Sequence, residues 1–506
     1  MEFFRPVVPP FFQRIRSRVV NACHQADAFE HRMVARFGVQ LVLFALWTFL
    51  FALLLTGYFV HEPWRDETQA WLMARDMTIP ELWRNAGTEG HPIGWHLLVK
   101  PLTLLGLPFD ALRLINIALV LAAAAVVLRA APFTIWQRAI VIFTPPFVYF
   151  GMYARNYSLL MLLCTLHAAA YASRHERPVR FGALLGAIAN TSVLFMPYVG
   201  LMGLWWLWET CRERLRGDRV AGVLLMGALI LLAFIQLIPP AEMAQVRTSN
   251  RWYVFFNALS VARGVKLFDF FIMPLFFIFP WLARLSSIDR ILSWIALGSM
   301  MFFPFVNAFV YGLSSWHWFA CFSIMLFVSW ILKVRSHRFG WDGRAVSACL
   351  VLFFWLAGFT VYESTRLFVI DTFTLASNSL EFLPYAREQL LDKDLAGHEI
   401  LNVTPLLAYI PDKKIWSPVS RQWTTYVSFD GHYVQNFTMP ADKAARIILD
   451  ECPVRRPWML FSKPWVNATL AGYALVHNAN QTSTMREAYY VYAPGPEGDM
   501  DETSKP

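Results

Sequence analysis

Long apolar runs are the feature that most constrains how this chain can fold. The first run, residues 39–60, contains no charged side chain. A helix needs about 20 apolar residues to cross the hydrocarbon layer of a membrane, which is about 30 Å thick. A run of this length therefore predicts a membrane span rather than a helix buried in a soluble domain.

Similar runs recur over the first three quarters of the chain. Hydrophobic residues make up 57% of the composition and charged residues 16%, whereas a soluble domain carries about 25% charged residues. Together these features predict a polytopic α-helical membrane protein with about eleven spans. The predicted spans are 39–60, 111–131, 134–153, 157–173, 181–195, 197–209, 220–240, 265–283, 290–311, 316–332 and 346–364.

The net charge of +9 would suggest a nucleic-acid partner in a soluble protein. Here the basic residues cluster between apolar runs, so the positive-inside rule explains them and no nucleic acid is expected. Every dense cluster falls on the cytoplasmic side if 92–107, which contains His96 and Lys100, lies along the outer surface as a juxtamembrane helix. The N-terminus is then cytoplasmic and the C-terminus extracytoplasmic.

Residues 1–38 form a basic leader without the apolar core of a signal peptide, and the run 39–60 is too long to be one. Arginines mixed with apolar positions over 11–37 suit an interfacial helix on the cytoplasmic membrane surface. A disordered basic leader is the alternative. The Gly182/Gly186 pair makes a small-residue face suited to helix packing, and Pro145-Pro146 predicts a kink.

The predicted transmembrane domain, 39–366, is followed by a polar tail, 367–506, in which we expect a small extracytoplasmic α/β domain. Helical spacing covers 383–391, and short strands are predicted at 398–403 and 489–493, with a short helix ending at Tyr409 between them. The last residues, 495–506, are expected to be disordered. The tail has one cysteine, Cys452, which excludes a disulfide within it.

The loop 61–110, which follows the first span on the outer side, contains the residues most suited to chemistry. Asp66 and Glu67 come a few residues after the membrane ends, where an uncompensated charge is costly. A carboxylate at this depth suits a general base toward a hydroxyl or a metal ligand. The alternative is that both residues are ordinary acidic residues in the first turn of a helix, with Ala70, Trp71, Leu72 and Ala74 on its membrane side.

Three features together carry a family resemblance: Asp66-Glu67 after the first span, Glu89-Gly-His91-Pro before an apolar juxtamembrane helix, and Arg113 opening the next span. This pattern resembles the GT-C glycosyltransferases, in particular the protein O-mannosyltransferase and aminoarabinose transferase group (family 39-like, RgtA/B/C/D-like). The resemblance covers roughly residues 40–330 and implies a GT-C-like fold. It does not extend to the tail and does not identify the acceptor.

The resemblance implies that Asp66 is the catalytic base, with Glu67 orienting it or binding the acceptor. It places Glu89 and His91 near the donor, where His91 would bind the phosphate or a metal; a structural histidine is the alternative. No cofactor is certain, and a divalent metal is compatible with Asp66 and His91 as candidate ligands.

A departing lipid phosphate requires cations at the outer interface. Arg155 lies at the predicted outer end of a span, against the positive-inside bias, which suggests phosphate binding; snorkelling is the alternative. Arg247 and Arg251 form a second outer basic group, suited equally to the donor or to lipid headgroups. His317 lies at similar depth, where its tryptophan neighbours favour an aromatic belt.

The sequence therefore predicts inverting transfer of a sugar from a polyprenyl-phosphate donor to an unknown acceptor (a glycan, a lipid or a protein), outside a bacterial inner membrane. The alternative is a transporter or flippase of a lipid-linked or anionic solute, although no internal repeat supports it. A scaffold whose tail binds a partner is a third hypothesis. The chain contains no P-loop, H-E-x-x-H or G-x-S-x-G motif.

Overall fold

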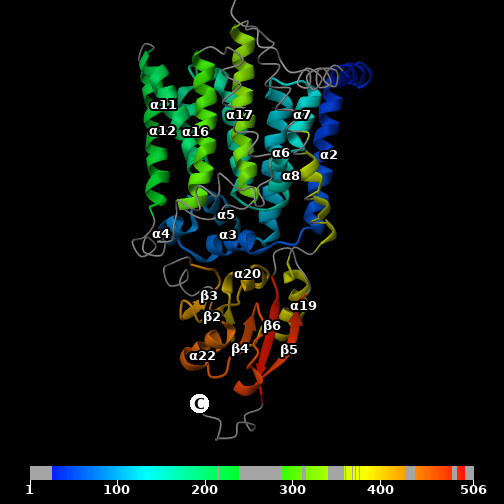
Figure 1. Cartoon of the computed structure of the whole chain (residues 1–506), viewed down its shortest axis with the longest axis vertical. Helices are drawn as coiled ribbons and strands as arrows, with labels where there is room; N and C mark the ends of the chain where they lie inside the picture. The colour runs from blue at the N-terminus through cyan, green and yellow to red at the C-terminus, as the bar shows by residue number, and fades with distance from the viewer. Residues whose placement is uncertain are drawn as a thin grey trace, which may run out of the picture.

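The computed structural model shows a helical bundle joined to a small α/β domain (Figure 1). Three short helices lie across the end of the bundle that faces this domain. The C-terminal sheet domain and the largely helical character agree with the sequence prediction. The structure describes residues 25–212, 216–238, 287–309, 315–339, 358, 361–366, 368–370, 372–374, 377–428, 439–480 and 487–495.

Three of the described helices are long and apolar enough to cross a membrane: α2 (Val39–Val60), α6 (Asp110–Ala130) and α12 (Gly217–Gln236). The surface of α2 is apolar and open, with Phe44 63% and Phe59 75% exposed. An exposed apolar surface of this extent requires an apolar surrounding, which a lipid bilayer supplies. Helix α6 is buried inside the bundle to a much greater degree, so its apolar residues form the core.

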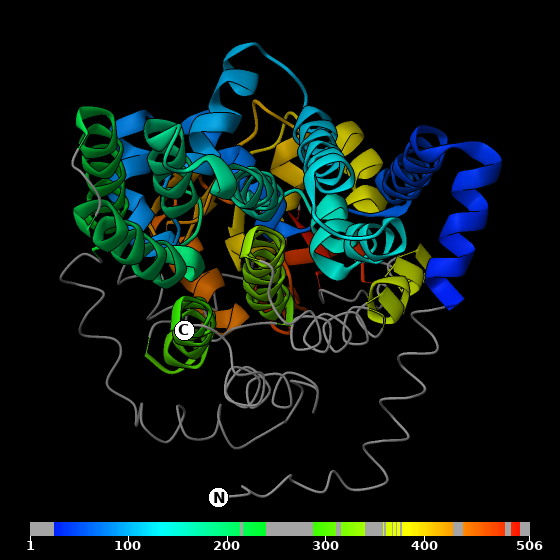
Figure 2. The same cartoon turned by 90° about the horizontal axis from the view of Figure 1, so that it is seen from above.

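Helix α6 packs against α2 and against the three helices that follow it in the chain. Seen along the bundle, α2 lies at one edge and α11 and α12 lie at the opposite edge (Figure 2). The predicted spans 265–283 and most of 346–364 lie outside the described residues. The remaining bundle helices are α7 (Ile135–Ile142), α8 (Pro145–Met152), α9 (Asn156–Ala170), α10 (Pro178–Ala189), α11 (Met196–Arg212), α16 (Ser287–Phe309) and α17 (Ser315–Phe339).

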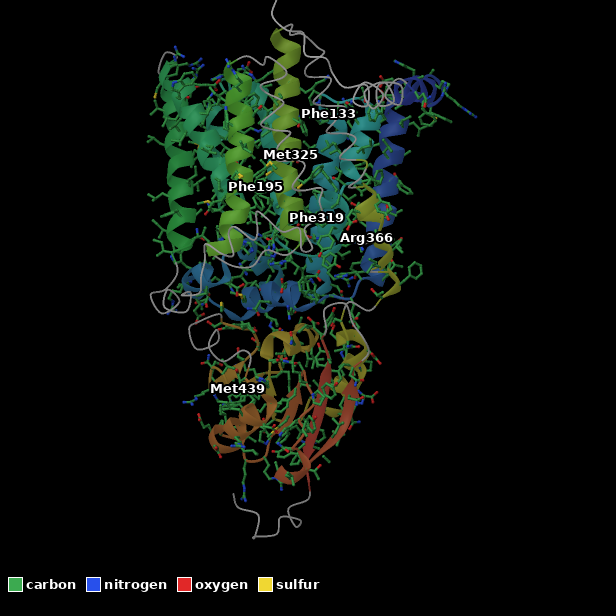
Figure 3. All side chains as sticks on the ribbon, in the orientation of Figure 1. Phe133, Phe195, Phe319, Met325, Arg366 and Met439 are labelled. Carbon is green, nitrogen blue, oxygen red and sulfur yellow. The ribbon has the colours of Figure 1, made fainter. Side chains whose placement is uncertain are left out.

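Two predicted spans are interrupted in the structure. The run 134–153 forms α7 and α8 rather than one kinked helix, because Pro145 and Pro146 cannot donate backbone hydrogen bonds and instead begin a new helix. The run 181–195 ends as an α-helix at Ala189 and continues as a 3₁₀ turn, Val193–Phe195. Figure 3 shows Phe133 at the far end of the bundle and Phe319 nearer the C-terminal domain.

Residues 25–37 form a helix lying crosswise at the far end of the bundle (Figure 1). Its Asp27 accepts a hydrogen bond from the Trp136 indole at 2.7 Å, which fixes it beside the start of α7. The same end holds the ion pair between Arg174 and Glu209, with a nitrogen–oxygen distance of 2.9 Å. The crosswise orientation is the one expected of an interfacial helix.

The opposite end of the bundle carries α3 (Arg65–Asp76), α4 (Ile79–Glu89) and α5 (Gly94–Leu104). These helices lie across the bundle axis (Figure 1), and α5 occupies the segment predicted as a juxtamembrane helix. Arg113 donates to the carbonyls of Tyr58 and His61 (2.9 Å for His61) and so caps the C-terminus of α2. The amide of Gly94 donates to the carbonyl of Asn190 at 3.1 Å, where a Cβ at position 94 would collide.

The C-terminal domain is a mixed six-stranded sheet with strand order β3-β2-β1-β4-β6-β5. Strand β1 pairs in parallel with β2 and β4, and the remaining pairs are antiparallel. The elements are α19 (Ser379–Gln389), β1 (Leu395–His398), α20 (Ile400–Tyr409), β2 (Ile415–Ser417), β3 (Gln422–Thr424), α22 (Ala441–Glu451), β4 (Trp458–Phe461), β5 (Tyr473–Ala479) and β6 (Tyr489–Pro494).

The strand predicted over 398–403 is wrong in position. Strand β1 ends at His398, and Glu399 takes a left-handed conformation (φ 52°) from which α20 begins. The apolar residues after Glu399 therefore form the first turns of a helix, which a short apolar run cannot distinguish from a strand. The final predicted strand is confirmed as β6.

Helix α20 lies beside α3, and the two helices share one hydrophobic core (Figure 1). Trp71, Leu72 and Ala74 of α3 are buried in a core that also contains Leu406 and Leu407 of α20. These α3 residues were predicted to face the membrane, and that prediction is wrong. A covering domain and a lipid surface both select apolar residues, so the pattern alone does not separate them.

Close packing of α10 against α12 gives a test of the bundle. A Cβ at Gly182 would lie 2.2 Å from the carbonyl oxygen of Gly222, whereas one at Gly227 would meet nothing within 4 Å. We expect Gly182→Ala to destabilise the purified protein by about 1–3 kcal/mol through overpacking. Gly227→Ala is the matched control and should be neutral or slightly stabilising, because alanine favours a helix. Equal melting temperatures in detergent would contradict this packing.

Candidate active site between the helix bundle and the C-terminal domain

The site is built at the first turn of α3, where Glu67 joins three parts of the chain. One oxygen of Glu67 accepts from the amide of Ala154 at 2.7 Å; the other lies 2.8 Å from the His61 ring and 3.2 Å from the Trp64 amide. The residue is fully buried. Its carboxylate therefore fastens α3 to the end of α2 and to the connection between α8 and α9.

Asp66 lies beside Glu67 in sequence but points to a different environment. Its Oδ2 is 2.9 Å from Nη1 of Arg155, and its Oδ1 is 3.8 Å from Nε of Arg65. The Asp66 and Arg155 side chains are 26% and 16% exposed, so the pair is partly open to solvent. A carboxylate and a guanidinium that are paired and still accessible can each exchange their partner for a ligand.

Glu89, at the end of α4, belongs to the same cluster. Its Oε1 accepts a hydrogen bond from the Gln69 amide nitrogen at 3.2 Å. The pKa of Glu89 is raised to about 7, mainly by burial; the hydrogen bond from Gln69 and the charge of Arg155 lower it, and the charge of Asp66 raises it. At neutral pH this side chain is therefore present both as a carboxylate and as a carboxylic acid.

His91 follows at the turn into α5 and packs edge-on against Tyr157, with ring centroids 6.4 Å apart. Burial lowers the pKa of His91 well below its usual range, and the charges of Arg155, His317 and His96 lower it further. Its ring is therefore neutral at pH 7. Its Nδ1 is buried without a hydrogen-bond partner among the residues that the structure describes.

The structure thus brings together Asp66, Glu89, His91 and Arg155, which the sequence predicted for one site. It places Glu67 next to them, with both oxygens bound by the protein. Arg247 and Arg251 lie outside the described residues. Within the described ranges, no three histidine, cysteine or acidic side chains are arranged to hold a metal ion.

Several residues of this cluster were missed by the sequence reasoning. Gln69 lies one helical turn after Asp66 on α3, so the helical period could have identified it. Tyr157 stands two residues after Arg155. His317, which was named from the sequence but assigned to an aromatic belt, packs against Tyr157 with ring centroids 6.3 Å apart. Val427, which binds Gln69, is too distant in sequence for any local pattern to reveal it.

Two buried carboxylates connect the cluster to the C-terminal domain. Glu62 accepts from the amides of Leu380 and Ser377, at 2.7 and 3.1 Å, and so caps α19. Glu487 accepts from the amide of Arg65 at 3.1 Å, at the start of α3. Burial raises the pKa of Glu487 to about 8. Arg65, which directly precedes Asp66, is therefore hydrogen-bonded to the C-terminal domain.

Comparison with known proteins does not add a name to this geometry. No protein-family model matches the chain, and no curated protein matches it.

The two adjacent acidic residues should differ in their effect on stability. Glu67→Gln leaves one backbone N–H without an acceptor in a fully buried position, and we expect a cost of about 1–3 kcal/mol. Asp66→Asn removes a partly exposed ion pair, which contributes about 0–1 kcal/mol. Thermal unfolding in detergent, followed by tryptophan fluorescence, measures both variants. A larger loss for Asp66→Asn would show that Glu67 does not fasten this junction.

Proposed function

We propose that this protein is a membrane glycosyltransferase. It transfers a sugar from a polyprenyl-phosphate donor to an acceptor hydroxyl on the outer face, with inversion and with Asp66 as the general base. The single observation that carries the proposal is the accessible Asp66–Arg155 pair at the end of an apolar helical bundle. A base beside an anion-binding cation is what displacement of a lipid phosphate requires.

The proposed orientation has the N-terminus in the cytoplasm and about eleven spans, giving a GT-C-like arrangement. It is supported by the distribution of basic residues over the described helices. The bundle end far from the C-terminal domain carries many arginines near helix ends. By the positive-inside rule this end faces the cytoplasm, and the α3 end then faces outward. Those arginines are Arg129, Arg138, Arg174, Arg177, Arg180, Arg212, Arg216 and Arg219.

The chemistry proceeds in one balanced step. Asp66 takes the proton of the acceptor hydroxyl as its oxygen forms a bond to the anomeric carbon of the donor sugar. The bond between that carbon and the phosphate oxygen breaks, and its electron pair leaves with the lipid phosphate. Arg155 stabilises the additional negative charge. Attack opposite to the leaving group inverts the anomeric centre.

The ion pair gives a reason for the order of binding. Without donor, Arg155 pairs with Asp66 at 2.9 Å, so the carboxylate is occupied by the guanidinium. A donor phosphate competes for the guanidinium because it offers an anionic oxygen of its own. Asp66 is then released toward the acceptor only when the donor is in place.

A loss-of-function test does not require the sugar to be identified first. Asp66→Asn removes the proton acceptor, and general-base catalysis contributes roughly 10²- to 10⁴-fold to a rate. We expect cells carrying this variant to accumulate a polyprenyl-phosphate-linked sugar, as cells lacking the protein would. Mass spectrometry of lipid extracts measures the intermediate, and its head group identifies the donor.

Asp392→Asn is the control, since Asp392 also pairs with a basic residue, Lys393, at 2.7 Å, and lies exposed on the C-terminal domain. It should leave the lipid profile as in the wild type. Wild-type lipid levels in the Asp66→Asn strain, at equal protein abundance, would remove Asp66 from the mechanism.

The orientation has its own test. With the six native cysteines replaced by serine, a cysteine at Arg84 on α4 should react with a membrane-impermeant maleimide added to intact spheroplasts. A cysteine at Glu176, which is exposed at the other end of the bundle, should react only after the membrane is opened. The reverse labelling pattern would place the proposed active site on the cytoplasmic side.

A further inference from the structure

We propose that Glu89 binds the donor as a neutral carboxylic acid, with its Oε2 hydroxyl donating a hydrogen bond to a phosphate oxygen that Arg155 also holds. This inference rests on the proposed function, since it assigns a role within the same site. It gives an acidic residue a place beside an anion, where a carboxylate would repel the ligand.

The side-chain amide of Gln69 has a fixed orientation. Its Oε1 accepts from the amide of Val427 at 3.0 Å, and its Nε2 donates to the carbonyl of Val427 at 2.6 Å. This two-way pairing with one backbone unit fixes which end of the side chain is nitrogen. The second hydrogen of Nε2 is directed to Oε1 of Glu89.

The orientation of Gln69 determines which oxygen of Glu89 can carry a proton. An amide nitrogen cannot accept a hydrogen bond, so Oε1 of Glu89 must be the acceptor toward Gln69. A proton on the Glu89 carboxyl group therefore sits on Oε2. For this atom the described part of the chain supplies no hydrogen-bond partner, and the side chain is partly accessible. The hydroxyl is then available to a ligand.

The segment that holds Gln69 is itself fixed. Val427 belongs to residues 425–428 of the C-terminal domain, which lie along α3 and α4. Thr425 donates to Asp76, and Ser428 donates to Asn85 at 3.1 Å. The Gln69 side chain therefore cannot rotate without breaking contacts between the helix bundle and the C-terminal domain. The fold thus determines that the proton of a neutral Glu89 lies on Oε2.

Burial is the main factor that favours the neutral form of Glu89. The charge of Asp66 on α3 acts in the same direction, whereas the hydrogen bond from Gln69 and the charge of Arg155 in the α8–α9 connection oppose it. His91 lies two residues later, and the groups that act on it are Arg155, His317 and His96. A donor phosphate would neutralise Arg155 and so leave burial and Asp66 to favour protonation.

The ligand class follows from the pair of donors. A guanidinium and a carboxylic acid both donate, so together they suit an oxyanion rather than a cation or a sugar ring. Ordinary acidic side chains cannot serve here, because two anions at contact distance repel. Binding should therefore require the protonated state, and affinity should fall as the pH rises through the titration of Glu89.

The test is direct binding of farnesyl methyl phosphate, a phosphodiester whose single charge does not change between pH 6 and pH 8.5. Isothermal titration calorimetry on the detergent-purified full chain gives the dissociation constant. For the wild type we expect the affinity to fall roughly tenfold or more over this range, because the binding-competent fraction falls. Glu89→Gln, whose amide also donates, should bind at every pH within about threefold of the wild type at pH 6.

Two further variants separate a specific role from a structural one. Glu81→Gln, on the same helix α4 and partly exposed, should keep the wild-type pH dependence. Gln69→Leu removes the hydrogen bond that lowers the pKa of Glu89, so its affinity loss should move to higher pH. A purely structural effect would weaken binding equally at every pH.

Wild-type binding that does not change with pH would overturn the proposal, as would a tenfold loss in Glu89→Gln or no binding by the wild type at all. The proposed function fails separately. Binding with the expected pH dependence, together with wild-type lipid profiles in Asp66→Asn cells, would contradict sugar transfer by Asp66 and support phosphate binding by Glu89. Accumulation of the donor in those cells, together with pH-independent binding, would support sugar transfer by Asp66 and contradict the role of Glu89.

Discussion

The buried carboxylate of Glu67 is the constraint on which the rest of the site depends. It links the end of α2, the first turn of α3 and the backbone at Ala154, three segments that would otherwise be free to move apart. Arg155 follows Ala154 directly and Asp66 precedes Glu67, so one buried group sets the distance between the ion-paired partners. Removing such a carboxylate lowers the free energy of unfolding by more than the net contribution of its hydrogen bonds, because the buried N–H donors are left without acceptors.

The C-terminal domain contributes directly to this arrangement. Apolar residues of α3 and α20 form one core, and Glu487 and Val427 reach the first turns of α3. Without this domain the charged cluster would be open to water, which screens charges and weakens hydrogen bonds. Covering α3 with protein lowers the local polarity and so strengthens the interactions among Asp66, Arg155 and Glu89.

The sequence predicted those parts of the fold whose cause is local. The apolar run 39–60 matches α2 residue for residue, and the prolines at 145 and 146 mark the interruption between α7 and α8. The clustering of Asp66, Glu89, His91 and Arg155 was also expected, although their roles remain predictions. The predictions that were wrong depend on distant contacts. The face of α3 that the protein covers was predicted to face lipid, and the strand predicted at 398–403 lies earlier in the chain, at Leu395–His398. The bond from Gln69 to Val427 joins residues 358 positions apart, which no local period can show.

Similar residue types can therefore carry different chemistry within one turn of helix. Glu67 has both oxygens bound by the protein and serves the fold, whereas Asp66 pairs with Arg155 and is partly open to solvent. Glu89 stands between these extremes, with one oxygen bound to Gln69 and a pKa of about 7. The proposed transfer, in which the site binds an anion and takes a proton, needs carboxyl groups in different protonation states. Differences in burial and hydrogen bonding supply them from side chains that are nearly identical in isolation.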